Sequence, residues 1–176
     1  TISNSTLRKG LDTLMNKKFN LSKSVLTVMN NQVYFDHSVI DNQKVDFKEI
    51  KQTAIDYLRK QNGISDAVDL RILNTATIPE EIRNRITNGY NARRSGDIYF
   101  ISKSNWFDGG ATGTTHGAWY PYDSHIPLVF MGWNVKPGKT NKTYYMSDIS
   151  PTLAAMLHIQ MPSGSIGNPI TEITNR

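Results

Sequence analysis

The sequence contains no cysteine, so disulfide bonds and thiolate metal ligands are excluded and any metal site must use histidine, aspartate or glutamate. No run of about 18 apolar residues occurs, so we expect no membrane-spanning helix. The first ten residues also lack the apolar core of a signal peptide, which suggests that Thr1 is a cut point or a mature terminus. With 176 residues, 38% of them hydrophobic, the chain can still bury a core.

Charge gives little indication of a partner. The formal net charge is +5, from 20 basic and 15 acidic residues, and the basic residues are scattered along the chain. A scattered distribution favours an ordinary solvated surface over a specific surface for nucleic acid.

The first part of the chain predicts a small accessory lobe. Residues 1–21 are polar and mixed, and we expect an α+β lobe over residues 20–76. Two β-prone segments flank Asn30 and Asn31, a pair that tolerates the left-handed backbone of a tight hairpin turn. Asp46 can cap the amphipathic helix that follows, and a further strand comes after that helix.

Residues 77–176 form a second region, whose character changes at Gly96; its interpretation as the C-terminal part of a catalytic α/β domain is implied only by a family resemblance of its motifs. A short helix is followed by an apolar strand at 96–102 and by a long loop at 104–124. Long loops in compact domains are usually functional. The continuous apolar run 125–132 is typical of a fully buried strand, and Asp148 is placed to cap a last helix.

The candidate metal ligand is His116, within the sequence GTTHG of the long loop. A histidine flanked by threonine and glycine can present a ring nitrogen to a metal or substrate while backbone amides approach closely. A loop histidine that only hydrogen-bonds its surroundings fits the same pattern, and spacing alone leaves both interpretations open.

Four segments together resemble a known family. In order along residues 22–168, they read MNNQVY, NGYNARRSGDIYFI, GTTHGAWYPYDSHIPLVFMGW and DISPTLAAMLHIQMPSG. This ordered set resembles the C-terminal part of the alkaline phosphatase superfamily, and is most similar to the monomeric bacterial zinc phosphatases with a threonine nucleophile. The resemblance implies an α/β fold, namely a C-terminal fragment of an alkaline-phosphatase-like fold that carries the α+β accessory lobe.

The same resemblance implies a site of two zinc ions, with His116 as a ligand of one of them. Asp123 and His125 follow closely and could orient the His116 ring, although His125 could equally bond only to backbone. The nucleophile and the other ligands of the family lie upstream of the matched segments. Because even an open catalytic zinc site has three protein ligands, we expect the fragment alone to bind zinc weakly and to be inactive.

Other residues admit two interpretations. The adjacent pair Asp36 and His37 mimics a metal-binding pair of the family, but it follows the accessory hairpin, which favours an exposed turn. Arg93 and Arg94 could approach a phosphate or form a salt-bridged surface pair. His158 is expected at the edge of the core. Several aromatic residues could line a leaving-group pocket or simply pack the loop: Trp106, Phe107, Trp119, Tyr120 and Tyr122.

The function that the resemblance implies is hydrolysis of phosphate monoesters by a longer, zinc-dependent phosphatase, with a phosphate ester as substrate and the missing N-terminal part of the same polypeptide as partner. A nucleotide pyrophosphatase or phosphodiesterase of the same superfamily is the alternative. A non-catalytic binding module is another, and it predicts a closed sheet without a bare apolar face. The resemblance further implies a periplasmic or secreted location.

Overall fold

The computed structural model describes residues 1–109, 112–113, 115–132 and 134–174. The chain divides into two compact units, Thr1–Ile126 and Pro127–Arg176. None of the helices in these described ranges is long and apolar enough to cross a membrane.

The first unit is built on a four-stranded antiparallel sheet with the strand order β1-β2-β4-β3. Its strands are β1 (Val25–Met29), β2 (Gln32–Phe35), β3 (Ile64–Asp69) and β4 (Ile98–Ser102). The predicted hairpin is confirmed, because β1 and β2 pair directly across a turn in which Asn30 and Asn31 have φ values of 50° and 61°. The strand predicted at 96–102 is confirmed as β4, which lies between β2 and β3.

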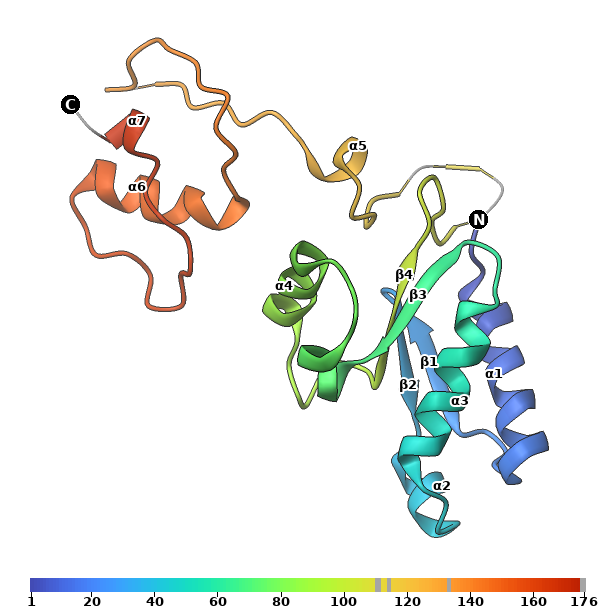
Figure 1. The fold of residues 1–176 in the computed structure, drawn as a ribbon. Coiled ribbons are helices and arrows are strands. Elements are labelled where there is room, and N and C mark those ends of the chain that lie inside the picture. The colour runs from blue at the N-terminus through green and yellow to red at the C-terminus, as the bar shows by residue number, and fades with distance from the viewer. Residues whose placement is uncertain (110–111, 114, 133, 175–176) are drawn as a thin grey trace. The chain divides into compact units, whose positions relative to one another are not determined.

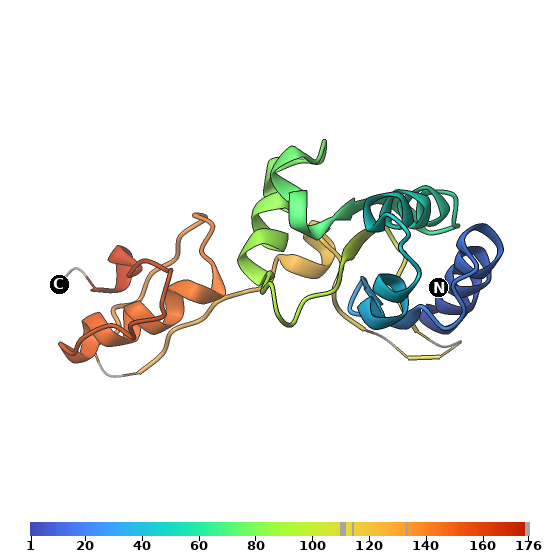
Figure 2. The same ribbon diagram turned by 90° about the horizontal axis from the view of Figure 1, so that it is seen from below.

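Two helices cover one face of this sheet, as Figures 1 and 2 show. They are α1 (Asn4–Phe19) and α3 (Phe47–Arg59), and their apolar residues share one core with the inward side chains of the strands. The predicted cap of α3 is confirmed, since the Asp46 carboxylate accepts a hydrogen bond from Lys48 N at 2.9 Å.

Helix α1 was not predicted. Residues 1–21 were expected to be a polar segment, yet Leu7, Leu11 and Met15 recur at four-residue intervals and are all buried. This spacing places them on one helix face, and the burial of their side chains against β1 supports a helix that is otherwise polar.

A second, smaller core covers the opposite face. It combines η1 (Leu70–Thr75) and α4 (Glu80–Gly89) with Val68 and Ile101 of the sheet. The strand expected after α3, over residues 65–73, is correct only as far as Asp69, because the chain there turns into η1, with Asp69 accepting from Arg71 N at 2.9 Å.

The predicted boundary between residues 76 and 77 does not separate two compact units. β4 pairs with β2 and with β3, so the same sheet contains strands from both sides of that boundary. The boundary between the two compact units lies instead after Ile126. The physical reason is that β4, one of the two central strands of the sheet, comes from the C-terminal side of the predicted boundary.

The second unit contains η2 (Met146–Asp148), α6 (Ile149–Leu157) and α7 (Thr171–Thr174). Thr152 is fully buried on α6, where its hydroxyl donates to Asp148 O at 2.6 Å and accepts from Ile170 N at 2.9 Å. This pair of bonds joins α6 to the segment that enters α7. Ala154 and Ile170 supply buried apolar surface beside it.

The buried strand predicted at 125–132 is wrong for this structure. The described residues of that run form no strand, and Val129 and Met131 are 81% and 94% exposed. A strand needs a neighbouring strand for its hydrogen bonds, and no described segment pairs with this run. Its apolar side chains therefore form bare surface, which is what a fragment predicts and a closed module does not.

Two expectations for the last helix also need correction. Asp148 precedes α6, but its carboxylate accepts from Tyr145 N and Asn168 N, at 2.8 and 2.9 Å, and makes no cap bond to the helix itself. It therefore joins two loop segments. His158 does not lie at a core edge: it is exposed and ends α6 in a left-handed conformation with φ of 54°.

Candidate active site around His116

The long loop predicted at 104–124 is confirmed in its described residues, 104–109, 112–113 and 115–124, which are mostly irregular and end in the short helix α5 (Pro121–Ser124). Two tyrosines of this helix region fasten it to the end of β4. The Tyr120 hydroxyl donates to Ser102 O at 3.1 Å, and the Tyr122 hydroxyl accepts from Asn105 N at 2.9 Å. The two rings are stacked at 5.7 Å. The helix that carries Asp123 is thereby positioned on the sheet.

Asp123 in turn holds the histidine loop. Its Oδ2 accepts from Gly117 N at 2.8 Å and from Ala118 N at 2.6 Å, while its Oδ1 lies 2.8 Å from Nδ1 of His116. The hydrogen bond with His116 and those with the two backbone amides lower the pKa of the Asp123 carboxyl. The carboxylate is therefore ionised at neutral pH. The Asp123 side chain is only 12% exposed.

His116 presents its other ring nitrogen outward. Its side chain is 94% exposed, and Nδ1 faces Asp123. When Nδ1 carries the proton and donates it to this carboxylate, Nε2 has a free lone pair. Metal-bound histidines typically donate their second ring N–H to a carboxylate in this way. The geometry fits an imidazole metal ligand, with Asp123 as its orienting partner.

The two predicted neighbours of His116 behave differently. Asp123 contacts the ring directly, whereas the described part of the chain gives no hydrogen bond to the His125 side chain. His125 is exposed, and its backbone N–H donates to Pro121 O at 2.9 Å, ending α5. The backbone interpretation therefore fits the contacts of His125.

His116 lines a cavity of about 300 Å³ together with residues from distant parts of the sequence. Asn30 and Asn31 come from the hairpin turn, Tyr99 from β4 and Asp108 from the loop. Burial raises the pKa of Tyr99 to about 12, so its hydroxyl keeps its proton. Two of the five aromatic candidates, Trp106 and Phe107, also line this cavity.

The hairpin asparagines, Tyr99 and Asp108 were missed as site residues. Nothing in the sequence links them to His116, because only the fold brings the hairpin turn and the end of β4 to the loop. Asp108 is held there by the N-terminus, where Ile2 N donates to Phe107 O at 2.8 Å and Asn4 Nδ2 donates to Asp108 Oδ2 at 2.5 Å.

The metal donor set in this chain is incomplete. Within the described ranges, no three histidine, aspartate or glutamate side chains come together as a metal site. A catalytic zinc site requires about three protein ligands. His116 therefore fits a metal site only when further ligands come from elsewhere.

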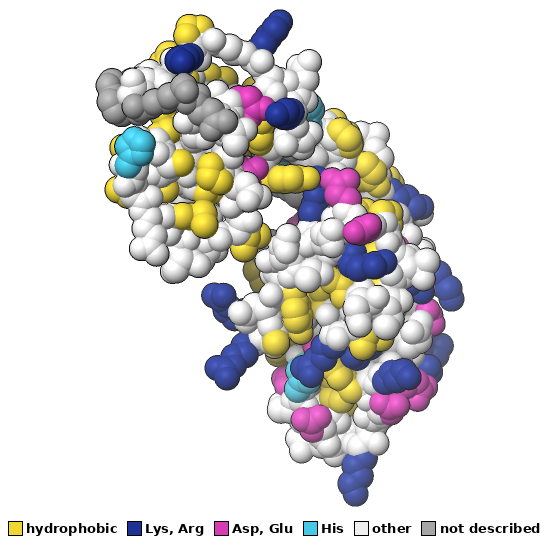
Figure 3. Space-filling view, turned by 60° about the vertical axis from the view of Figure 1, so that its left-hand side comes forward, with side chains coloured by type: hydrophobic (Ala, Val, Ile, Leu, Met, Phe, Trp, Pro, Cys, Tyr) yellow, Lys and Arg dark blue, Asp and Glu magenta, His cyan; other side chains and the backbone are white. Residues whose placement is uncertain are grey.

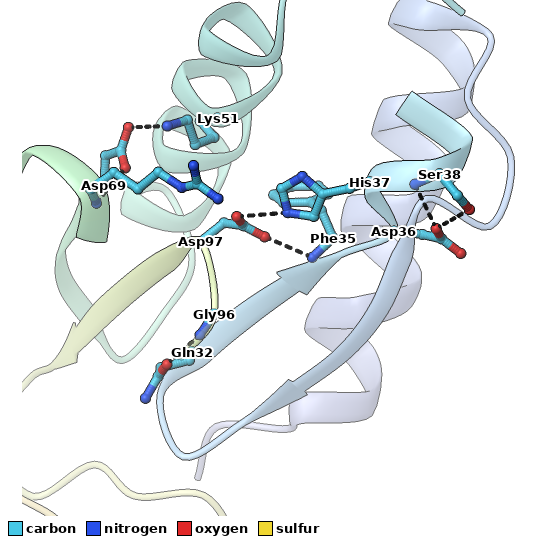
Figure 4. A network of polar contacts seen from close by, with 10 residues as sticks. Gln32, Phe35, Asp36, His37, Ser38, Lys51, Asp69, Gly96 and Asp97 are labelled. Atoms are coloured by element: carbon cyan, nitrogen blue, oxygen red, sulfur yellow. Dashed lines mark hydrogen bonds and ion pairs between the residues drawn. The ribbon is translucent and has the colours of Figure 1, made fainter. Parts of the chain in front are cut away.

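The pair Asp36 and His37 begins a helix and does not form a turn, although His37 is exposed as expected. Asp36 caps α2 (His37–Asn42), with its carboxylate accepting from Ser38 N and Val39 N. A hydrogen bond from the Ser38 hydroxyl, at 2.6 Å, is the main cause that lowers the pKa of Asp36. His37 Nε2 lies 3.0 Å from Oδ1 of the buried Asp97 (Figure 4). Asp36 thus caps a helix, whereas His37 contacts a buried carboxylate.

No protein-family model matches the sequence, but individual proteins do. Alkaline phosphatase PhoV of Synechococcus elongatus is 56% identical over 163 residues, which cover 93% of this chain and 30% of that protein. Alkaline phosphatase PafA of Elizabethkingia meningoseptica is 40% identical over 171 residues, covering 97% and 31%. A Myroides odoratus protein named calcium-transporting ATPase is 43% identical over 168 residues, covering 94% and 31%.

The fold agrees with these matches. The crystal structure of wild-type PafA superposes with a TM-score of 0.93 at 38% identity, covering 99% of this chain and 34% of that one. The predicted α/β class and C-terminal alkaline-phosphatase-like fold are therefore confirmed. The chain spans about 30% of the length of the curated relatives it matches. It belongs to the alkaline phosphatase-like proteins, as a C-terminal part of such a protein.

Proposed function

We propose that this chain completes the active site of a longer, metal-dependent phosphatase that hydrolyses phosphate monoesters. The observation that carries the proposal is the His116–Asp123 pair: an exposed imidazole whose Nδ1 is held by an ionised carboxylate, at the edge of a cavity of about 300 Å³. The names of PhoV and PafA support phosphatase chemistry.

In this proposal His116 binds one of two zinc ions through Nε2. Such ions, when bound, activate the attacking oxygen and stabilise the charge of the transferring phosphoryl group. The contribution of this chain is positional: Asp123 fixes the ring, Gly117 and Ala118 are fixed by the same carboxylate, and Tyr120 and Tyr122 fasten their helix to β4. The remaining ligands and the nucleophile would come from the rest of the longer polypeptide.

The test is to measure turnover of aryl phosphate monoesters and diesters by the full-length protein. We expect His116→Ala to reduce monoester turnover by roughly 100-fold or more and to lower the bound zinc measured by mass spectrometry. His125→Ala is the matched control, since it also removes an exposed imidazole from the same loop. Near-normal turnover by His116→Ala would remove the site assignment.

Comparing the substrates in this experiment distinguishes the proposed function from its alternatives. A large preference for diesters would favour a nucleotide pyrophosphatase or phosphodiesterase, and binding without turnover would favour a non-catalytic module. The name of the Myroides odoratus relative makes ATP a useful additional substrate. We further propose a periplasmic or secreted location, which cell fractionation tests.

A further inference from the structure

A second cavity, of about 260 Å³, lies in the first unit among residues that the proposed active site does not use. Four separate segments contribute to it: β1, β2 with the start of α2, η1, and the connection 90–97 between α4 and β4. Its polar lining residues are Tyr34, His37, Arg71, Tyr90, Arg93 and Ser95, together with the buried Asp97.

Two arginines give this cavity its charge. Arg71 comes from η1 and Arg93 from the turn after α4, so two arginines that lie 22 positions apart in sequence line the same cavity. Within the described residues, neither guanidinium forms an ion pair or a hydrogen bond, whereas Arg59 and Arg85 are paired with Asp66 and Glu81. The salt-bridged surface pair expected of Arg93 and Arg94 is therefore not formed among these residues.

The carboxylate in the cavity is already occupied. Asp97 is 6% exposed, its Oδ1 lies 3.0 Å from His37 Nε2 and its Oδ2 accepts from Phe35 N at 3.1 Å (Figure 4). Both oxygens thus have partners from the protein. Two arginines against one engaged carboxylate leave the cavity with an excess of positive charge.

Backbone contacts fix this arrangement. Asp97 N donates to Val33 O at 2.8 Å, and Gly96 N donates to Gln32 Oε1 at 2.7 Å. A Cβ at Gly96 would lie 2.6 Å from Val33 O, so only glycine allows the turn to approach β2 this closely. The rings of His37 and Phe47 also pack in an edge-type geometry, with centroids 4.8 Å apart. These contacts fix the wall of the cavity formed by Gly96 and Asp97, while Arg71 and Arg93 reach it from the exposed surface.

We propose that this cavity binds a small oxyanion of the phosphate type, either free phosphate or the phosphoryl group of a small ester. Guanidinium groups match the oxygens of phosphate with paired N–H donors, and two arginines line this cavity together with Ser95. The volume lies just below the range typical of drug-sized ligands, which favours a compact ligand. The basic side chains elsewhere are spread over the face shown in Figure 3.

The experiment is calorimetric titration of the full-length protein with inorganic phosphate and, separately, with methylphosphonate, which cannot be hydrolysed to phosphate. We expect a class of sites that Arg71→Met and Arg93→Met each weaken by about tenfold or more, because each removes charged hydrogen bonds. Arg94→Met is the matched control: it removes a neighbouring guanidinium that does not line the cavity. Arg93→Lys should bind with intermediate affinity.

The result is separable from the proposed activity. Inhibition of monoester turnover by phosphate reports the active centre, and we expect its inhibition constant to be the same in the Arg71 and Arg93 variants as in the wild type. Tighter binding of phosphate than of methylphosphonate identifies free phosphate as the ligand, and the reverse order identifies an ester. The proposal is overturned if neither the Arg71 nor the Arg93 variant weakens any phosphate binding. It is also overturned if Arg94→Met weakens phosphate binding as much as they do.

Discussion

Nδ1 of His116 lies 2.8 Å from Oδ1 of Asp123, and the other oxygen of the same carboxylate accepts the next two backbone amides. One side chain therefore fixes both the orientation of the imidazole and the path of the loop that carries it.

Asp123→Asn tests this relationship in the full-length protein. The amide oxygen would keep accepting from Gly117 and Ala118, which turns the amide NH₂ toward His116 Nδ1 and favours the tautomer with the proton on Nε2. Nε2 would then lose its free lone pair. We expect zinc affinity and turnover to fall by about 10- to 100-fold. His125→Gln should leave both unchanged; an unchanged zinc affinity in Asp123→Asn would contradict an orienting role.

The buried pair of Lys51 and Asp69 predicts a stability effect. The two side chains are in direct contact between α3 and the end of β3, and are only 11% and 10% exposed. Lys51→Met leaves the Asp69 carboxylate buried without its partner, so we expect a loss of about 3 kcal/mol in the free energy of unfolding. Urea unfolding measures this change.

The double variant Lys51→Met/Asp69→Asn is the control for that experiment. The double variant leaves no uncompensated charge. Its loss in free energy of unfolding should therefore be smaller than the sum of the losses of the two single variants. Strict additivity would show that the ion pair contributes no coupling.

The Thr152 hydroxyl predicts a second stability effect, within the unit 127–176. Thr152→Val keeps the shape of the side chain but leaves the buried Ile170 N without its acceptor. We expect unfolding of this unit to become easier by about 1–3 kcal/mol. Ser150→Ala, an exposed position on the same helix, should change stability little. Hydrogen exchange at Ile170 measures the difference, and an unaltered exchange rate would exclude this bond as a stabilising contact.

Glu172 gives a pH-dependent prediction. Hydrogen bonds from Lys142 and Tyr144 lower its pKa from 4.5 to about 2. A lowered folded-state pKa means that the contribution of the ionised Glu172 is fully present above about pH 4.5 and is lost as the pH falls through about 2. Compared with wild type, Glu172→Gln should exchange backbone amides of α7 faster at neutral pH, with the difference vanishing near pH 2. A difference that persists unchanged at the lowest pH would refute this assignment.

Elements with local signals were predictable from the sequence. The asparagine pair specifies the β1–β2 turn, Asp46 begins α3, and the apolar run at 98–102 forms β4. Each depends on neighbouring residues, which a sequence displays directly. Even α1 carried a readable signal, the four-residue spacing of Leu7, Leu11 and Met15, although its otherwise polar composition concealed it.

What the sequence by itself determined is therefore the local elements with a clear signal, such as the β1–β2 hairpin, α3 and β4, and, through its ordered motifs, the superfamily; the role of His116 is a proposal. Only the tertiary structure decided which distant residues meet: Asp97 with His37, Arg71 with Arg93, and the hairpin asparagines with His116. It also decided that the apolar run 125–132 forms no strand with the described residues. The physical reason is that these outcomes depend on partners far away in the chain, whose position is set by sheet pairing and core packing and not by local propensity.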